Sequence, residues 1–457
     1  MYRARIAPVA TAREDGVMKR LSLLLTACVS FGSTTAESIC LPIVCGPPPP
    51  TLWVWGNDNP SCPTTLQDCI DGAAPGDVVE IATNFPIGDS VTISKSLTLD
   101  AAPGFAPVFV NAGIFASTPT TGDGSIAIEN ISMQPGSIGV VQQSTGTLDV
   151  RITGNTIELP FSDEGEGAIF LEESQSTIGA LTFEISGNTI SVPGPEEFAI
   201  SAEFESNSSS GRIANNSISM GGGFGAIVLS SLGGGSINVD VIANRISGPG
   251  YNDGILISQG MGTTQVRIAD NLITGERPQG GQVGAIALDA GAGTLTATVV
   301  NNTLVDDDFA IGDLRQSGGG TLTGVVANNI IAGSAARGFL LPAGTLSNAN
   351  NVIFDDAGDS FTPGPGTVTA DPLFVDAAFG DYHLKPGSPA IDAGDDGSVP
   401  ADLTTDLDGS ARIQGRHVDI GAYETAPEPE GAFGAVVGLS ALAALAERRA
   451  AREEPRR

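Results

Sequence analysis

The sequence predicts an all-β protein built as a parallel β-helix, in which the chain winds through a stack of similar coils. A short phrase recurs seven times between residues 150 and 331 and ends each time in Asn, one free position, and Ile or Leu. The Asn positions are 33, 28, 28, 27, 31 and 27 residues apart, a period typical of stacked solenoids. Gly accounts for 60 of the 457 residues and aromatic residues for only 5 %. Together with many Val and Ile residues, this composition indicates short strands joined by tight turns.

Each copy of the phrase begins with an apolar residue three positions before its Asn. The seven Asn residues are Asn155, Asn188, Asn216, Asn244, Asn271, Asn302 and Asn329. A second apolar phrase, as in 167–171, and a third, as in 181–185, lie within the period. Several short strands and no helix in each period favour a β-helix with one coil per period, because a propeller blade would need about ten residues more and antiparallel hairpins.

The repeated Asn can be interpreted as a functional row or as part of the scaffold. Stacking places each Asn over the next, where its amide can bond to the turn backbone and to its neighbour, and Asn tolerates the left-handed geometry of such a turn. A functional row would require different chemistry on different coils, whereas one residue type repeated favours a scaffold. We therefore expect a structural Asn ladder.

The residue four positions before the Asn is charged on the first five coils. In order, these residues are Arg151, Glu184, Arg212, Asp240 and Arg267. The Ile or Val beside each of them must face the core, so alternation places the charges on the outer face. Coils stack about 4.8 Å apart, which lets opposite charges pair laterally. We expect an outer charge ladder that fixes coil order; because its charges cancel, it makes a poor ligand-binding row.

The stretch before the repeats predicts an end cap for the β-helix, which we place at 61–369. Residues 64–71 are expected to form a short helix with Thr64 or Thr65 as the N-cap, and 78–82 and 91–99 to form strands. A helix followed by strands protects the open end of a coil array, where exposed backbone groups would recruit another chain.

The N-terminal 36 residues have the features of a signal peptide: Lys19 and Arg20, a short apolar run, and small residues up to Ala36. Met18 is an alternative start, since acidic residues precede it. Residues 25–28 also resemble a lipobox, which would make Cys28 a lipidated N-terminus; ordinary cleavage fits the length better. A Cys/Pro-rich linker, 37–60, follows and contains a polyproline spacer.

All five cysteines precede residue 70. With one in the signal peptide, an even number remains in an exported protein, which favours disulfides. Of the three possible pairings we favour Cys40 with Cys45 and Cys62 with Cys69. The alternative is a zinc site, but a gap of six residues fits tetrahedral ligand spacing poorly.

The formal net charge of −31 understates the acidity of the exported body. Ten of the 21 basic residues lie in the first 20 or the last ten residues, which we assign to targeting segments. An anionic body repels nucleic acid and anionic lipid. We therefore expect no nucleic-acid partner, and contact with a membrane only through the C-terminal tail.

The sequence indicates no catalytic residues. It contains only two histidines, His383 and His417, which argues against a His-based triad. Pectin-degrading enzymes resemble this architecture, and they use paired carboxylates, or a base with calcium and basic groups. The carboxylates that could serve are Asp306, Asp307, Asp308, Asp313, Asp355 and Asp356. An acidic, solvated turn is the alternative. The body contains only two tryptophans and few basic residues. It therefore has few side chains that could stack on sugar rings or bind uronate carboxylates.

The segment 370–425 departs from the repeat. It contains Gly380-Asp-Tyr-His-Leu-Lys-Pro-Gly-Ser-Pro-Ala-Ile-Asp-Ala-Gly394 and Val418-Asp-Ile-Gly-Ala-Tyr-Glu424. It closely resembles the C-terminal segment of bacterial choice-of-anchor Q proteins. The resemblance implies an exported surface protein with a right-handed, pectin-lyase-like β-helix and no established catalytic residues. Within the segment, Asp402, Asp406 and Asp408 could bind calcium through their oxygens, or could instead stabilise a turn.

The tail, 426–457, combines Pro427-Glu-Pro429, an apolar run from Ala432 to Ala446, and a basic end. It resembles a PEP-CTERM sorting signal, which implies processing by a protease of the exosortase type. It departs from that pattern in length, since eight residues follow Arg449. A plain membrane anchor is the alternative, although about 20 apolar residues are usual for a span.

These observations predict an exported, non-catalytic β-helix protein of the cell surface or extracellular matrix, with a structural or adhesive role. A surface polysaccharide is a candidate partner, and calcium is the one cofactor considered. The alternative function is that of a polysaccharide (pectin or uronate) lyase or a glycoside hydrolase.

Overall fold

A computed structural model describes residues 50–56, 62, 64–117, 121–159, 167–174, 179–194, 197–205, 208–249, 253–275, 284–307, 309–313, 319–334, 337–340, 346–355 and 363–426. The chain divides into two units, 1–50 and 51–457, and the description concerns the second. The expected signal peptide, most of the linker, the sorting tail, Cys28, Cys40 and Cys45 lie outside the described residues.

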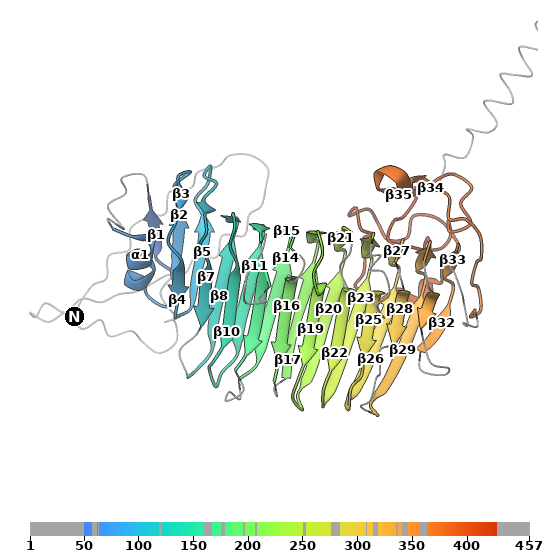
Figure 1. The fold of residues 1–457 in the computed structure, drawn as a ribbon, viewed down its shortest axis with the longest axis horizontal. Helices are drawn as coiled ribbons and strands as arrows, with labels where there is room; N and C mark the ends of the chain where they lie inside the picture. The colour runs from blue at the N-terminus through green and yellow to red at the C-terminus, as the bar shows by residue number, and fades with distance from the viewer. Residues whose placement is uncertain are drawn as a thin grey trace, which may run out of the picture. The chain divides into compact units, whose positions relative to one another are not determined.

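The second unit is a right-handed parallel β-helix, which confirms the fold predicted from the repeat. Its strands form three parallel sheets, and successive strands of one sheet come from successive coils (Figure 1). We name the sheets A, B and C.

Sheet A has twelve strands: β1 (Leu52–Trp55), β2 (Val78–Ile81), β5 (Leu97–Ala101), β8 (Gly124–Glu129), β11 (Leu148–Thr153), β14 (Leu181–Ser186), β17 (Ser208–Ala214), β20 (Ser236–Ile242), β23 (Thr263–Ala269), β26 (Thr294–Val300), β29 (Thr321–Ala327) and β32 (Leu346–Ala349). Sheet B has eleven: β3 (Pro86–Ile87), β6 (Val108–Phe109), β9 (Ser132–Met133), β12 (Thr156–Glu158), β15 (Thr189–Val192), β18 (Ser217–Met220), β21 (Arg245–Ser247), β24 (Leu272–Thr274), β27 (Thr303–Val305), β30 (Ile330–Ala332) and β33 (Val352–Phe354). Sheet C has ten: β4 (Val91–Ile93), β7 (Ile114–Ser117), β10 (Ile138–Gln142), β13 (Ile169–Glu173), β16 (Phe198–Phe204), β19 (Gly225–Ser231), β22 (Asp253–Gln259), β25 (Gly284–Asp289), β28 (Phe309–Asp313) and β31 (Arg337–Leu340).

The core lies inside the coils, and the strand pattern of alternating residues creates it. In β11, Leu148, Val150 and Ile152 are buried, while Asp149 and Arg151 between them are exposed. The register pairs Ile152 with Ile185 of the next coil, and the same stacking continues along the array. Each inward side chain therefore packs on a similar one above and below, and a shift of one residue would turn an apolar row to solvent.

The N-terminal end of the array is covered by α1 (Leu66–Gly72), the cap helix expected from the sequence. Thr65 is its N-cap and forms a capping box with Asp68. The side-chain amide of Gln67 bonds to both the N–H and the C=O of Thr92, at 2.8 and 2.9 Å, on the edge strand β4. The helix thus satisfies backbone groups that an open edge would expose. A disulfide joins Cys62 to Cys69.

Two details of the N-terminal region differ from the predictions. The linker does not extend to residue 60, because β1 already pairs with β2 in sheet A; Asp77 holds this strand by accepting from Thr51 N–H and Trp53 Nε1–H. The predicted strand 91–99 is two strands, β4 and β5, in different sheets. The apolar positions on the two sides of the corner are in phase and only Lys95 interrupts them, so pattern alone did not show the break.

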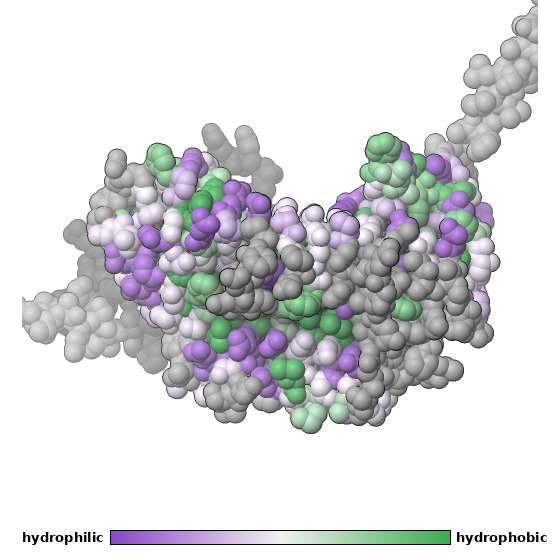
Figure 2. Space-filling model, in the orientation of Figure 1, coloured by the Kyte–Doolittle hydropathy of each residue, from purple (hydrophilic) through white to green (hydrophobic). Residues whose placement is uncertain are grey.

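Residues beyond 363 form a C-terminal segment with little regular structure. It contains a small antiparallel pair, β34 (Phe374–Asp376) and β35 (Asp381–Leu384), and two short 3-10 helices, η1 (Ala377–Phe379) and η2 (Asp396–Ser398). Figure 2 shows hydrophobic residues gathered over the end with β34 and β35, where Val375 is 41 % and Phe379 89 % exposed. The rest packs beside the last coils, as shown below.

Within the described part of the chain, no helix is long and apolar enough to cross a membrane.

Candidate functional site

The seven predicted ladder Asn residues lie at the corner between sheets A and B, and all are buried. Each donates its backbone N–H and its side-chain Nδ2–H to Oδ1 of the Asn on the next coil, at 2.9–3.1 Å. The same Nδ2 also donates to a backbone carbonyl of the preceding coil, as in Asn244 to Ile213 at 2.9 Å. The row is thus one continuous hydrogen-bonded column inside the protein and is closed to ligands.

The ladder contains one more member than the sequence predicted. Asn351 accepts from Asn329 N–H at 2.9 Å and Nδ2–H at 3.0 Å. The repeat phrase missed this coil because Asn348 occupies the position that is apolar in the other copies.

The left-handed residue of each corner is not the ladder Asn but the residue before it. Those residues have φ between 51° and 69°: Gly154, Gly187, Asn215, Ala243, Asp270, Asn301, Asn328 and Asn350. The sequence interpretation assigned the left-handed geometry to the ladder Asn itself, which is wrong. A corner of this kind turns one side chain inward and the preceding one outward, so each coil offers a second, external position.

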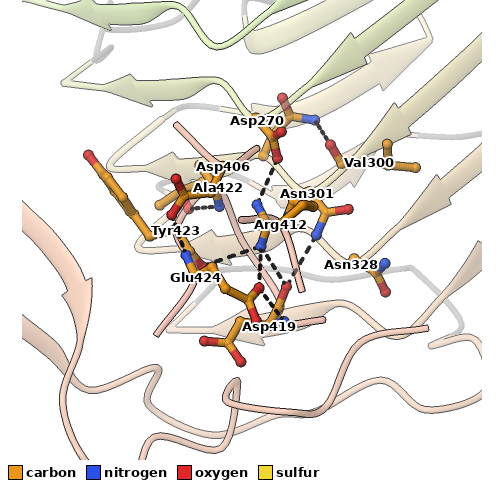
Figure 3. Close-up of polar contacts among 12 residues, drawn as sticks. Asp270, Val300, Asn301, Asn328, Asp406, Arg412, Asp419, Ala422, Tyr423 and Glu424 are labelled. Atoms are coloured by element: carbon orange, nitrogen blue, oxygen red, sulfur yellow. Dashed lines mark hydrogen bonds and ion pairs between the residues drawn. The ribbon is translucent and has the colours of Figure 1, made fainter. Parts of the chain in front are cut away.

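The external corner residues of the last coils hold the C-terminal segment (Figure 3). Asn301 Nδ2 donates to the carbonyl of Asp419 at 3.1 Å. Asn328 bonds to both backbone groups of Asp395, donating from Nδ2 at 3.0 Å and accepting at Oδ1 at 2.8 Å. Asn350 Nδ2 donates to the carbonyl of Ala393 at 3.4 Å. The first two coils of the ladder carry Gly at this position and offer no such contact.

Asp270, the external corner residue of the fifth coil, pairs with the buried Arg412 of the C-terminal segment. Arg412 contacts Asp270 at 2.8 Å and Glu424 at 3.1 Å, and each of the three side chains is at most 1 % exposed. Arg412 also donates to the carbonyls of Asp419 and Tyr423, at 3.2 and 3.4 Å. One cation thus lies between two carboxyl groups at the interface of coil and segment (Figure 3).

Burial raises the pKa of both carboxyl groups around Arg412. Desolvation raises the pKa of Asp270 to about 7, against the opposing attraction of Arg412. Desolvation likewise raises the pKa of Glu424 to about 7, although it accepts from the N–H groups of Gln414 and Asp419. Since one guanidinium balances only one negative charge, we expect the pair to retain a proton near neutral pH.

A second polar network joins the segment to sheet B. His383 contacts Asp381 through Nδ1 and Asp408 through Nε2, both at 2.6 Å, and Asp408 forms an ion pair with Arg245 of β21 at 2.6 Å. Partial burial lowers the pKa of His383, but the hydrogen bonds to the two carboxylates outweigh it, and the net direction is upward. The ring also packs on Tyr423, with the ring centroids 4.2 Å apart. His417 pairs with Asp396 at 3.1 Å on the exposed side of the segment.

These groups predict that docking of the C-terminal segment weakens as the pH rises from about 5 to about 8. Asp270 and Glu424 have folded pKa values above their unfolded ones, so the folded state loses its extra protons over this range. The stabilising charge of His383 is lost in the same direction, as the pH passes its raised pKa. A tenfold difference in proton affinity between the folded and unfolded states corresponds to about 1.4 kcal/mol of stability.

Hydrogen exchange of 370–425 at pH 5, 6.5 and 8 should show faster opening at high pH. The variant Asp270→Asn should flatten this dependence; slower opening at pH 8 would contradict the prediction.

The three calcium candidates do not form a metal site. Asp402 pairs with Arg267 at 2.5 Å, which lowers its pKa, and Asp408 pairs with Arg245 and His383. Asp406 accepts from the N–H groups of Asp408, Ser410 and Glu424 at 2.7–3.1 Å. Among the described residues no group of three or more acidic, His or Cys side chains could hold a metal ion. The contacts of these carboxylates, with the segment's own turn and with the coils, fit the turn interpretation.

Of the Asp residues considered for catalysis, Asp306, Asp307 and Asp355 follow strands of sheet B, and Asp313 ends β28 of sheet C. Asp306 and Asp355 have φ values of 67° and 57°, and they stand where Gly275 and Gly333 turn the chain on other coils. Asp307 is buried beside Asp306. Asp308 and Asp356 lie outside the described residues, and for Asp313 only the backbone is described. Asp306, Asp307 and Asp355 therefore fit the turn interpretation.

The five charged residues of the predicted outer ladder are in register, each opposite the next along sheet A. Ion pairs join Arg267 to Asp240, at 2.5 Å, and Arg151 to Glu129 of the preceding coil, at 2.6 Å. Glu184 instead accepts from Ser186. Within the described residues no ion pair joins Glu184 to Arg151 or Arg212, so the continuous alternating chain of pairs that we expected is incomplete.

The same outer face of sheet A contains an open groove of about 480 Å³. Two columns of outward side chains, from β11, β14, β17 and β20, line it. The first, the charged column, consists of Arg151, Glu184, Arg212 and Asp240. The second, the polar column, consists of Asp149, Thr182, Ser210 and Asn238. The charged column could be predicted from the sequence, but the polar column could not, since hydroxyl and amide residues are common on any outer strand face.

No protein-family model matches this sequence, and no curated protein is significantly similar to it. Among solved structures, the pectate lyase Pel9A is similar with a TM-score of 0.40 and 12 % identity, over 79 % of this chain and 91 % of that one. The alginate lyase AlyGC of family PL6 is similar with a TM-score of 0.34 and 11 % identity, over 83 % of this chain and 60 % of that one. Likenesses this weak say nothing about the activity of this chain.

Proposed function

We propose that the protein is an exported, non-catalytic scaffold of the cell surface or extracellular matrix, with a structural or adhesive role. The observation that supports this most is where the perturbed carboxyl groups lie. Asp270 and Glu424, with pKa values raised to about 7, are sealed between the coils and the C-terminal segment. Asp253, whose pKa burial raises to about 6, is 6 % exposed and accepts from Gly284 N–H. An enzyme needs its acid or base in contact with substrate.

Two further sets of polar contacts serve assembly. The Asn column holds coil to coil, and the corner residues with Arg412 hold the C-terminal segment to the coils. The targeting features of the sequence complete the proposal: a leader at 1–36 for export, and a tail at 426–457 processed by an exosortase-type protease, with membrane contact only before processing.

The competing function is that of a lyase or hydrolase acting on pectin or another uronate polymer. Three of its candidate carboxylates, Asp306, Asp307 and Asp355, follow strands of sheet B in turns, and the acidic body disfavours an anionic substrate.

One experiment on the purified full-length protein separates the two functions. We expect no release of unsaturated or reducing sugars from pectin or alginate, with or without calcium, and we expect the protein in the surface or matrix fraction of the producing cells. Sugar release above a heat-denatured control would favour the enzyme. Retention in the cytoplasm would refute the export proposal independently of the assay.

A further inference from the structure

The groove on sheet A lies outside every structural role described so far. It lies on the outer face of four consecutive strands, with backbone at Val150, Phe183 and Gly211 between its two columns. A Cβ on Gly211 would lie 2.4 Å from the ring of Phe183, which packs beneath it. Gly211 thus makes room for this ring in the core, and the floor of the groove between the two columns consists of inward-facing positions.

The ends of the groove are neutralised and its centre is not. At one end Arg151 is paired with Glu129. At the other, Asp240 is paired with Arg267, which also binds Asp402 of the C-terminal segment. Among the described residues Arg212 has no ion pair, and its guanidinium stays exposed at the centre. A hydrogen-bond donor with five N–H groups is thus available beside Ser210 and Asn238.

The charges of the groove select against a charged polymer. Three carboxylates, Asp149, Glu184 and Asp240, accompany two guanidinium groups, and the whole chain carries a formal charge of −31. A polyanion is repelled at long range, and a cationic chain meets Arg212 at the centre. Because the charges of the row nearly cancel, it is a poor site for a charged ligand. The same cancellation favours an uncharged ligand rich in hydrogen-bonding groups.

The spacing of the columns indicates a polymer. Donors and acceptors recur once per coil, about 4.8 Å apart, which is close to the length that one pyranose ring adds to an extended glycan. The columns run across the strands, along the coil axis. The paired donors of Arg212, the paired acceptors of Asp149 and the donor and acceptor of the Asn238 amide match vicinal hydroxyl groups. The lining offers little apolar surface for a hydrophobic ligand.

We propose that this groove binds an uncharged, hydroxyl-rich polysaccharide that lies along the coil axis, with Arg212 as its central donor. The inference rests on the proposed adhesive role and gives it a place and a ligand class.

The test is binding of the full-length protein to soluble dextran, laminarin and mannan, against polygalacturonate and alginate, by affinity electrophoresis and calorimetry. We expect at least one neutral glycan to bind and the two polyanions to bind more weakly. Arg212→Ala should weaken binding by about tenfold or more, because hydrogen bonds from a charged donor are lost. Ser210→Trp, which fills the groove from an exposed position, should abolish binding. Arg416→Ala, an exposed arginine on the C-terminal segment, is the matched control and should bind like the parent.

Three results would overturn the proposal: no binding to any neutral glycan, tighter binding of a polyanion, or equal affinity of the Arg212 and Arg416 variants. Circular dichroism and thermal melting of each variant show whether it is folded, and the Trp variant decides the question if Arg212→Ala fails to fold. Loss of binding leaves the scaffold function standing, whereas sugar release would overturn the non-catalytic role and not the groove.

Discussion

Replacing Arg412 by Met is expected to destabilise docking of the C-terminal segment by about 3–5 kcal/mol, because it leaves carboxyl groups buried without their cation. Asp270 and Glu424 face Arg412 at 2.8 and 3.1 Å, and both are closed to water. Without the guanidinium, the two carboxyl groups become neutral only when they are protonated. Their raised pKa values favour protonation at low pH. The defect should therefore be larger at pH 8 than at pH 5.

Hydrogen exchange and limited proteolysis resolve this effect by region. We expect 390–425 to open while 97–200, in the N-terminal coils, stay protected, since repeat arrays couple mainly to nearest neighbours. Arg416→Met, on an exposed face of the same segment, should change stability by no more than about 0.5 kcal/mol.

Removing the carboxyl groups as well, in Arg412→Met with Asp270→Asn and Glu424→Gln, should recover part of the loss, because no uncompensated charge remains. Wild-type protection of 390–425 in the single variant would show that Arg412 does not hold the segment.

The fold could be predicted because the sequence repeats the information that determines it. The ladder Asn, the apolar alternation and the period follow from one coil packing on the next, so seven copies of one phrase predicted stacked coils of several short strands. Asn351 was not predicted, because Asn348 stands at the position that is apolar in the other copies. The hydrogen-bonded column nevertheless continues through Asn351.

The interface of the C-terminal segment could not be predicted in this way. Arg412 and Asp270 are 142 residues apart, and Arg412 belongs to no repeating pattern. One local signal was present: the residue before the ladder Asn is Gly on the first two coils of the phrase and Asn or Asp on most later ones. From Asp270 on, these residues contact the C-terminal segment, but only the structure shows that their side chains point outward.

The roles of Asp402, Asp406 and Asp408 could not be predicted for a related reason. They are close in sequence, and nothing in that spacing distinguishes metal ligands from turn acceptors. Asp402 and Asp408 pair with Arg267 and Arg245 on the coils, which only the docked segment brings near.

In the middle of the ladder, replacing Asn244 by Ala is expected to cost about 3–5 kcal/mol in the free energy of unfolding, from several buried polar groups that lose their partners. Asn244 Oδ1 accepts from the N–H and Nδ2–H of Asn216, at 3.1 and 3.0 Å. Its Nδ2 donates to the carbonyl of Ile213 and to Oδ1 of Asn271, at 2.9 and 3.0 Å. No solvent reaches these atoms, so water cannot replace the lost bonds.

Asn238→Ala is the matched control, because Asn238 belongs to the same coil and is exposed on β20. Its free energy of unfolding should lie within about 0.5 kcal/mol of the parent's. Urea unfolding measures both variants. A midpoint shift in Asn244→Ala with an unchanged slope indicates a weaker but still cooperative array, whereas a smaller slope indicates that coils on either side of Asn244 unfold separately. Equal midpoints for the two variants would show that the column does not stabilise the coils.

Asn244→Asp sharpens the comparison, since it preserves the acceptor toward Asn216 but removes the donors to Ile213 and Asn271. It should be at least as destabilising as Ala, because it also buries a charge among acceptors.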